Sequence, residues 1–254
     1  LFIIPPLIEF SETLGGEAHE ELATYAFSFR DEVTGKNLSI RPDISEQAAR
    51  IDAYRFQSTD PVRLCYAGEV AKNKTSQILR SRTSLQVGAE IFGDADLSAD
   101  IESINLMIES LLTVGIENLT LSLGHAGLIS YILDSFRSNP QIEIQDIQSA
   151  LSRKSESDIL NFSSDLINSD QKQLLLDLSK LYGGIEIILE ARDKLEYLGE
   201  ITEKYLNYLD EVIIKLDLDN QVNIHIDLAE IYGFRYHNGI VFSAYTDSAG
   251  YSLS

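Results

Sequence analysis

Residues 62–70 read VRLCYAGEV and residues 84–92 read SLQVGAEIF, and these two stretches decide the fold. Both contain the aliphatic and aromatic residues that favour strands. Between them lies a polar stretch, residues 72–82, which carries four of the 20 basic residues of the chain. Two strand-like runs joined by a polar loop predict a β-hairpin.

On the N-terminal side, the sequence predicts a second hairpin followed by a helix. Residues 24–29 alternate bulky and small side chains and end at a turn over residues 31–37. Residues 38–41 resume as the partner strand. Beyond them, apolar residues recur at helical spacing, at Ile44, Ala48 and Ile51.

On the C-terminal side, the pattern is mostly helical before it returns to strands. Spacing of three and four predicts a helix over residues 97–114, and alternation predicts strands at 119–123, 222–228 and 239–245. Strands that pair largely as antiparallel hairpins, with helices to one side, predict an α+β fold. We expect three parts: the first part of the sheet core in 1–125, a helical insertion in 126–210 and a return to the sheet in 211–254.

The composition argues against several classes of protein. The 20 Lys and Arg residues face 40 Asp and Glu residues, so the net charge is −20, which weighs against binding to nucleic acid. One cysteine, Cys65, excludes an internal disulfide framework and suits a reducing cytosol. No apolar run is long enough to span a bilayer. Neither end resembles a natural terminus, and we expect a fragment.

The common catalytic signatures are mostly absent. The chain has no phosphate-binding loop and no nucleophile elbow. Its four histidines show no spacing that would place two on one metal, so no metal site is expected; they are His19, His125, His225 and His237. Gln86 and Glu90 lie on the same face of one predicted strand. They belong either to a solvated sheet face or to a pocket for a small cationic or amide-bearing ligand.

Several segments resemble a known family. Residues 38–43 resemble the first histidine-pocket motif of histidyl-tRNA synthetases, and residues 64–93 resemble their class II motif 2. Residues 232–242 resemble the second histidine signature in the form found in a paralogue, the ATP phosphoribosyltransferase regulatory subunit. Further segments are similar to that subunit, namely 4–10, 88–93, 123–127 and 181–184. The resemblance implies a class II aminoacyl-tRNA synthetase-like antiparallel sheet flanked by helices, truncated before motif 3.

Two departures from the synthetase pattern bear on catalysis. Lys72 and Tyr232 stand where the synthetases carry arginines. Amino-acid activation develops negative charge on the α-phosphate of ATP, which bidentate arginines stabilise best, whereas lysine is a point charge and tyrosine is neutral. The resemblance therefore implies a protein that has lost adenylation and needs no cofactor.

At the positions that match the histidine-binding pocket of the synthetases, this chain resembles the family in residue type. The positions that match this pocket are Asp43, Ser45, Gln86, Glu90, Tyr236 and His237. Asp43 replaces the glutamate usual in the synthetases, so its side chain is one methylene shorter. A pocket that binds histidine without activating it is a sensor.

The resemblance thus implies a cytoplasmic regulatory subunit without catalytic activity. Such a subunit activates the catalytic subunit of the short-form ATP phosphoribosyltransferase and conveys inhibition by free histidine, in a hetero-octamer of four chains of each kind. Its self-association as a dimer would use the region Ile3–Phe10. The alternative is a histidyl-tRNA synthetase core that uses Lys72 together with a motif 3 arginine beyond Ser254. That alternative requires tRNA to dock on a chain of charge −20.

Overall fold

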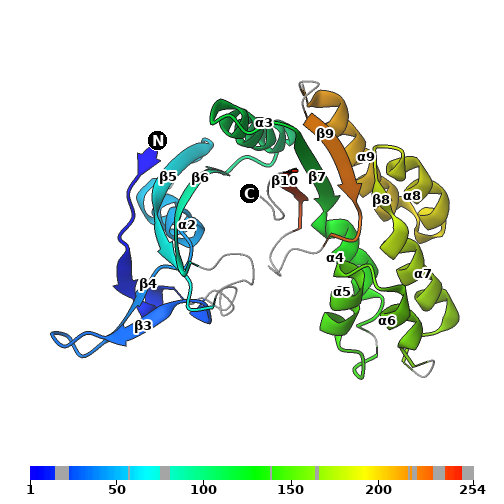
Figure 1. The fold of residues 1–254 in the computed structure, drawn as a ribbon, viewed down its shortest axis with the longest axis horizontal. Coiled ribbons are helices and arrows are strands. Elements are labelled where there is room, and N and C mark those ends of the chain that lie inside the picture. The colour runs from blue at the N-terminus through cyan, green and yellow to red at the C-terminus, as the bar shows by residue number, and fades with distance from the viewer. Residues whose placement is uncertain are drawn as a thin grey trace. The chain divides into compact units, whose positions relative to one another are not determined.

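The computed structural model describes residues 1–14, 23–56, 58–74, 81–137, 139–163, 166–216, 218, 222–230 and 238–247. The chain divides into two compact units, Leu1–Ala99 and Asp100–Ser254. Figure 1 shows the ribbon of both units.

The first unit is built on the predicted long hairpin. Strands β5 (Val62–Ala71) and β6 (Thr83–Phe92) pair antiparallel, with Leu64 opposite Glu90 and Gly68 opposite Gln86. The short strand β1 (Phe2–Ile3), which the sequence analysis did not predict, pairs parallel to β5 and completes a three-stranded sheet of order β1-β5-β6. The hairpin prediction is confirmed.

A second sheet in this unit has the order β2-β4-β3 and is wholly antiparallel. Its strands are β2 (Ile8–Phe10), β3 (Phe27–Arg30) and β4 (Asn37–Ile40), and the short turn η1 (Ser11–Thr13) follows β2. The predicted helix follows β4 as α2 (Ser45–Ile51) and continues into a π-helical turn, η2 (Asp52–Phe56).

The core of the first unit lies between α2 and the long hairpin. Ile44 and Ala48 are fully buried and pack in one cluster with Ile3, Leu64, Tyr66 and Val70. Full burial of a large aliphatic side chain such as Ile44 or Leu64 stabilises the fold by about 1.5–3 kcal/mol. This cluster fixes the position of α2 over one face of the hairpin.

The second unit has a four-stranded sheet of order β10-β7-β9-β8. The central strand β7 (Leu119–His125) pairs antiparallel with β10 (Ile240–Thr246) and parallel with β9 (Val222–Asp227). The sequence analysis expected largely antiparallel hairpins. The parallel pair arises because a long helical crossover separates β7 from β9, and a crossover returns the chain in the same direction.

Helices occupy most of the crossover, as the spacing of apolar residues predicts. The helix α3 (Leu97–Thr113) precedes β7. After β7 the chain forms α4 (Ala126–Asp134), α5 (Ile144–Ser152), α6 (Glu156–Asn161), α7 (Ser169–Lys180), α8 (Ile187–Leu195), the short turn η3 (Glu196–Leu198) and α9 (Glu200–Lys215). The strand β8 (Tyr182–Gly183), which pairs with β9, was not predicted because two residues carry no periodicity. Within the described ranges, no helix is long and apolar enough to cross a membrane.

Candidate ligand-binding site

Four of the candidate pocket residues meet over the long hairpin of the first unit. Gln86 and Glu90 lie four residues apart on β6, so both side chains project from the same face of the strand. Asp43 and Ser45 lie at the start of α2, which the apolar cluster holds against this face. The sheet and the helix N-terminus therefore bring together residues that are more than 40 positions apart.

Hydrogen bonds join the loop before α2 to Gln86. The Gln86 Nε2 donates to Asp43 Oδ2 at 3.2 Å, and the Ile44 backbone N–H donates to Gln86 Oε1 at 3.0 Å. Asp43 Oδ1 also accepts from the Ser45 backbone N–H at 2.7 Å. Both ends of the Gln86 amide are thus engaged, and Asp43 is held in one orientation.

Tyr66 completes the group and was missed by the sequence analysis. Its hydroxyl donates to Glu90 Oε1 at 3.0 Å and lies 3.1 Å from Ser45 Oγ. Tyr66 is only 4% exposed. The signal that could have found it is the register of the hairpin, because Tyr66 stands opposite Gly88, midway between Gln86 and Glu90.

Gly88 is required by this arrangement. A Cβ added at Gly88 would lie 2.5 Å from the ring of Tyr66, closer than any tolerated contact. The tyrosine ring therefore occupies the space above the glycine, and its hydroxyl reaches the neighbouring carboxylate. The spacing Gln86-x-Gly88-x-Glu90 places Gly88 between the two polar side chains, where it leaves room for the ring of Tyr66.

Burial alters the acidity of two groups in the pocket. The pKa of Glu90 is raised above its ordinary value, chiefly by burial and also by the negative charge of Asp43, although hydrogen bonds from Ser45 and Tyr66 oppose the shift. Burial likewise raises the pKa of the Tyr66 phenol, which stays protonated at neutral pH. A partly buried carboxylate with a raised pKa next to a second carboxylate is a candidate for a functional site.

The arrangement suits a ligand that donates hydrogen bonds. Asp43 and Glu90 offer carboxylate oxygens to an ammonium or imidazole N–H, and Ser45 adds a hydroxyl. Among the residues that the structure describes, no group of three His, Cys, Asp or Glu side chains could hold a metal ion. The arrangement of Asp43, Ser45 and Glu90 is compatible with a small polar or cationic molecule.

Four of the predicted residues remain. Tyr232, Tyr236 and His237 lie outside the described residues. Lys72 follows the end of β5 with an exposed side chain, and its backbone N–H donates to the Arg82 carbonyl at 2.8 Å.

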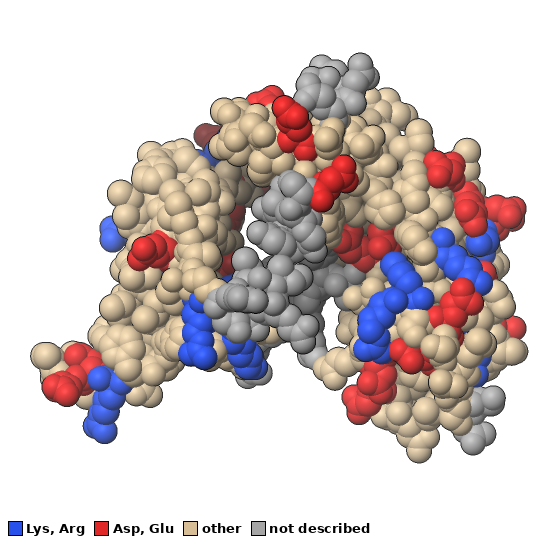
Figure 2. Space-filling model, in the orientation of Figure 1, with Lys and Arg blue, Asp and Glu red and all other residues tan. Residues whose placement is uncertain are grey.

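The charges on the surface bear on the binding of polyanions. On the face shown in Figure 2, the described Lys and Arg side chains lie singly or in small groups among Asp and Glu side chains. A polyanion binds where basic side chains form a continuous surface. On this face, the described part of the chain offers no such surface.

One histidine has a structural role in the second unit. His125 is 6% exposed and caps the N-terminus of α4, because its Nδ1 accepts from the Gly127 backbone N–H at 3.1 Å. Its ring packs at 4.5 Å from that of Tyr205. Burial lowers the pKa of His125 to about 4, so the ring is neutral at physiological pH.

An open cavity of about 660 Å³ lies in the second unit along α9, with Arg192, Thr202 and Tyr208 in its lining. The Arg192 guanidinium already pairs with the carboxylates of Glu203 and Asp210. The Arg192 side chain of this cavity is therefore already engaged by carboxylates of the protein itself.

The fold is that of a class II aminoacyl-tRNA synthetase-like core. A family model described as histidyl-tRNA synthetase matches residues 2–254, and the chain belongs to this family. Within it, the chain belongs with the ATP phosphoribosyltransferase regulatory subunits. It is 33% identical over 257 residues to the regulatory subunit of Thiobacillus denitrificans, covering 99% of this chain and 77% of that protein. The family membership expected from the sequence is confirmed.

Other relatives agree, and they are longer than this chain. The regulatory subunit of Hydrogenovibrio crunogenus is 34% identical over 96% of this chain but only 62% of its own length. A crystal structure from Bacillus halodurans C, described as an ATP phosphoribosyltransferase regulatory subunit/histidyl-tRNA synthetase, matches with a TM-score of 0.82 and 27% identity over 99% of this chain and 65% of that chain. The predicted α+β fold class is confirmed.

A structure of an assembly has the same fold. The ATP phosphoribosyl transferase (HisG:HisZ) complex from Thermotoga maritima contains a chain that matches with a TM-score of 0.68 at 17% identity, over 98% of this chain and 82% of that chain. At this identity the match concerns the fold alone.

The raised pKa of Glu90 leads to a prediction about stability. The folded chain holds the Glu90 proton more tightly than the unfolded chain does, so the free energy of unfolding falls as pH rises above 4.5 through the raised folded pKa. The variant Glu90→Gln keeps an oxygen that accepts from Tyr66 but does not titrate. We expect it to be more stable than the wild type at about pH 8, with a difference that shrinks toward about pH 5.

Urea denaturation across this pH range provides the measurement. Glu69→Gln is the matched control, because Glu69 is exposed on the opposite face of β5. Its free energy of unfolding should follow that of the wild type throughout. A Glu90→Gln variant that is less stable than the wild type at the alkaline end would contradict the prediction.

Proposed function

We propose that this chain serves as a non-catalytic regulatory subunit of the short-form ATP phosphoribosyltransferase, which catalyses the first step of histidine biosynthesis. In this role it activates the catalytic subunit and conveys feedback inhibition by histidine. The observation that carries the proposal is the 33% identity to a regulatory subunit of which the chain covers 77%. The chain spans 62% of the length of the Hydrogenovibrio crunogenus subunit, so the activity and partners of the whole protein form part of the proposal.

The pocket supports histidine as the effector. Free histidine carries an α-ammonium group and an imidazole N–H, both hydrogen-bond donors. Asp43 and Glu90 supply carboxylate acceptors, and Tyr66 and Ser45 hold Glu90 in place. Charge-assisted hydrogen bonds of this kind contribute roughly 1.5–3 kcal/mol each. Tyr236 and His237 are proposed as further contacts on the basis of the resemblance.

The loss of adenylation supports a regulatory role. Lys72 and Tyr232 replace the two arginines that stabilise the α-phosphate in synthetases. A lysine at the end of β5 supplies one charge without the planar fork that grips two phosphate oxygens. A chain that recognises histidine but cannot activate it reports the concentration of the amino acid.

The proposal includes an assembly in the cytoplasm. The catalytic subunit is the proposed partner, and the Thermotoga maritima complex of the same fold supports such a pairing. Self-association through residues Ile3–Phe10, within a hetero-octamer of four chains of each kind, belongs to the same proposal. The domain division at residues 125 and 210 is also retained as a proposal.

A synthetase core that activates histidine is the competing function, because the matching family model carries the name histidyl-tRNA synthetase. We expect no histidine-dependent exchange of pyrophosphate into ATP, since neither Lys72 nor Tyr232 can bind two phosphate oxygens at once as an arginine does. The assay follows labelled pyrophosphate, with an authentic histidyl-tRNA synthetase as positive control. Robust exchange by the purified chain would favour the synthetase function instead.

The regulatory function predicts a physical complex. Mixing the purified protein with a short-form catalytic subunit should give a larger species and a faster phosphoribosyl transfer than the catalytic subunit alone. Light scattering after gel filtration and a continuous activity assay measure the two effects. Separate elution together with an unchanged rate would count against the proposal.

The pocket predicts a separation of activation from inhibition. Removal of the carboxylate in Glu90→Ala should raise the histidine concentration for half-inhibition by about tenfold, because one charge-assisted hydrogen bond is lost. Activation should persist, since it depends on the contact with the catalytic subunit rather than on the pocket. Inhibition curves of the reconstituted complex measure the effect, with exposed Glu69→Ala as the control. An unchanged curve with normal activation would place the histidine site elsewhere.

A further inference from the structure

The loop that carries Asp43 and Ser45 is anchored on its other side by a buried cation. Arg41 is 4% exposed, and its guanidinium donates from Nη1 to the Pro5 carbonyl at 2.8 Å and from Nε to the Glu69 carbonyl at 2.9 Å. No carboxylate lies within ion-pair distance of Arg41 in the described part of the chain; its partners are carbonyl oxygens and the Gln47 amide oxygen at 3.2 Å. Burial lowers the pKa of Arg41, with the charge of Glu9 opposing the shift.

Arg41 also lies against the strand that faces the pocket. A Cβ at Gly68 would lie 2.2 Å from Arg41 Nη2, so a larger residue at this point of β5 would displace the guanidinium. Gly68 pairs in register with Gln86, whose amide binds Asp43. Arg41 and the pocket are therefore linked through one pair of strand residues, Gly68 and Gln86.

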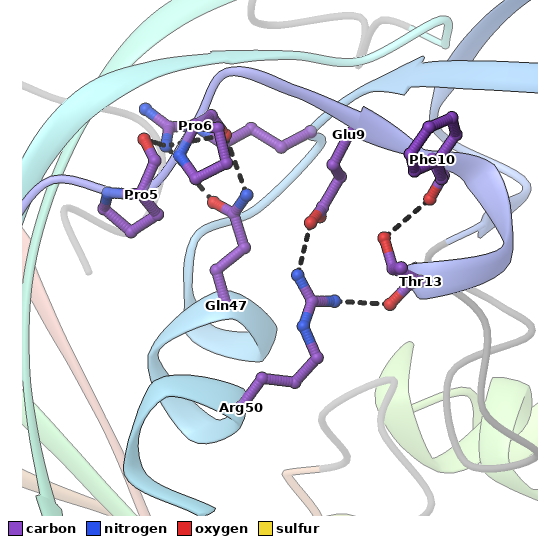
Figure 3. A network of polar contacts seen from close by, with 8 residues as sticks. Pro5, Pro6, Glu9, Phe10, Thr13, Gln47 and Arg50 are labelled. Carbon is purple, nitrogen blue, oxygen red and sulfur yellow. Dashed lines mark hydrogen bonds and ion pairs between the residues drawn. The ribbon is translucent and has the colours of Figure 1, made fainter. Parts of the chain in front are cut away.

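Helix α2 adds two more anchors to the same region, which we call the N-terminal segment and define as residues Pro5–Thr13. The Gln47 Nε2 donates to the Pro6 carbonyl at 2.8 Å, and Arg50 binds both the Glu9 carboxylate and the Thr13 carbonyl. Figure 3 shows Gln47 and Arg50 reaching from the helix to this segment. Gln47 is 2% exposed, so its hydrogen bond is not exchanged with water.

The helix thus has two functional faces. At 100° per residue, Gln47 lies about 200° and Arg50 about 140° around the helix from Ser45. Ser45 touches the pocket through Tyr66, and the two other side chains hold the N-terminal segment. A rigid helix with ligand contacts on one face and segment contacts on the other cannot shift at one without shifting at the other.

We propose that α2 couples occupancy of the pocket to the seating of the N-terminal segment, with Gln47 and Arg50 as positioning residues for ligand binding. The inference rests on the proposed function, which supplies histidine as the ligand. By thermodynamic linkage, a contact that seats the segment must change the affinity for the ligand by the same factor as the ligand changes the seating. Leu7 and Ile8 in this segment are exposed, so a change in seating alters the surface offered to a neighbouring chain.

The test uses the 254-residue chain with free histidine as the probe. In the wild type, histidine should slow amide exchange in residues 7–13, measured by hydrogen–deuterium exchange. Gln47→Met, which keeps the size of the side chain but loses the donor to Pro6, should abolish this slowing. It should also weaken histidine binding about fivefold by calorimetry, at the low end of typical coupling.

Two further variants keep the test decisive. Arg55→Met removes an exposed cation on the neighbouring turn and should change neither the exchange nor the affinity. Arg50→Lys retains the charge facing Glu9 but loses the fork to Thr13, and it should weaken binding even if Gln47→Met fails to fold.

The two possible failures are distinguishable. Histidine binding to the wild type with unchanged exchange in residues 7–13, or wild-type affinity in the folded variants, would overturn the coupling alone. Absence of any histidine binding to the wild type would overturn the proposed ligand and the coupling together.

Discussion

The register of the β5–β6 hairpin is the constraint on which the pocket depends. Leu64 opposite Glu90, Tyr66 opposite Gly88 and Gly68 opposite Gln86 follow from a single choice of pairing. Because side chains alternate along a strand, a slip by one residue would turn Gln86, Gly88 and Glu90 away from α2. Gly88 and Gly68 fit this pairing because each leaves space for a large side chain. One admits the ring of Tyr66 and the other admits the guanidinium of Arg41.

The first unit buries more charge than its core requires. Arg41 is buried, Glu9 and Glu90 are partly buried, and each of the three has at least one polar partner. Burial of charge costs stability unless hydrogen bonds compensate it. The concentration of such groups around one short helix is the physical reason for regarding α2 as part of a binding device rather than as simple packing.

The structure shows which sequence signals were sufficient. The long hairpin and the long helix over 97–113 were predictable, since each carries a sustained period of two or of three to four residues. The two-residue strands β1 and β8 were not, because they are too short to have a period. The expectation of largely antiparallel pairing missed two parallel pairs, which arise from chain segments far apart in sequence.

The sequence by itself determined the longer helices and strands, the family resemblance and four of the residues that meet in the pocket, because motif spacing and strand alternation are local properties. Only the tertiary structure decided that Tyr66 joins these four residues. It also decided that Arg41, Gln47 and Arg50 tie α2 and the residues before it to the N-terminal segment. These contacts span 24 to 41 positions of sequence. They depend on how strands pair and on where a helix rests, and no local pattern encodes a distance between segments that meet only after folding.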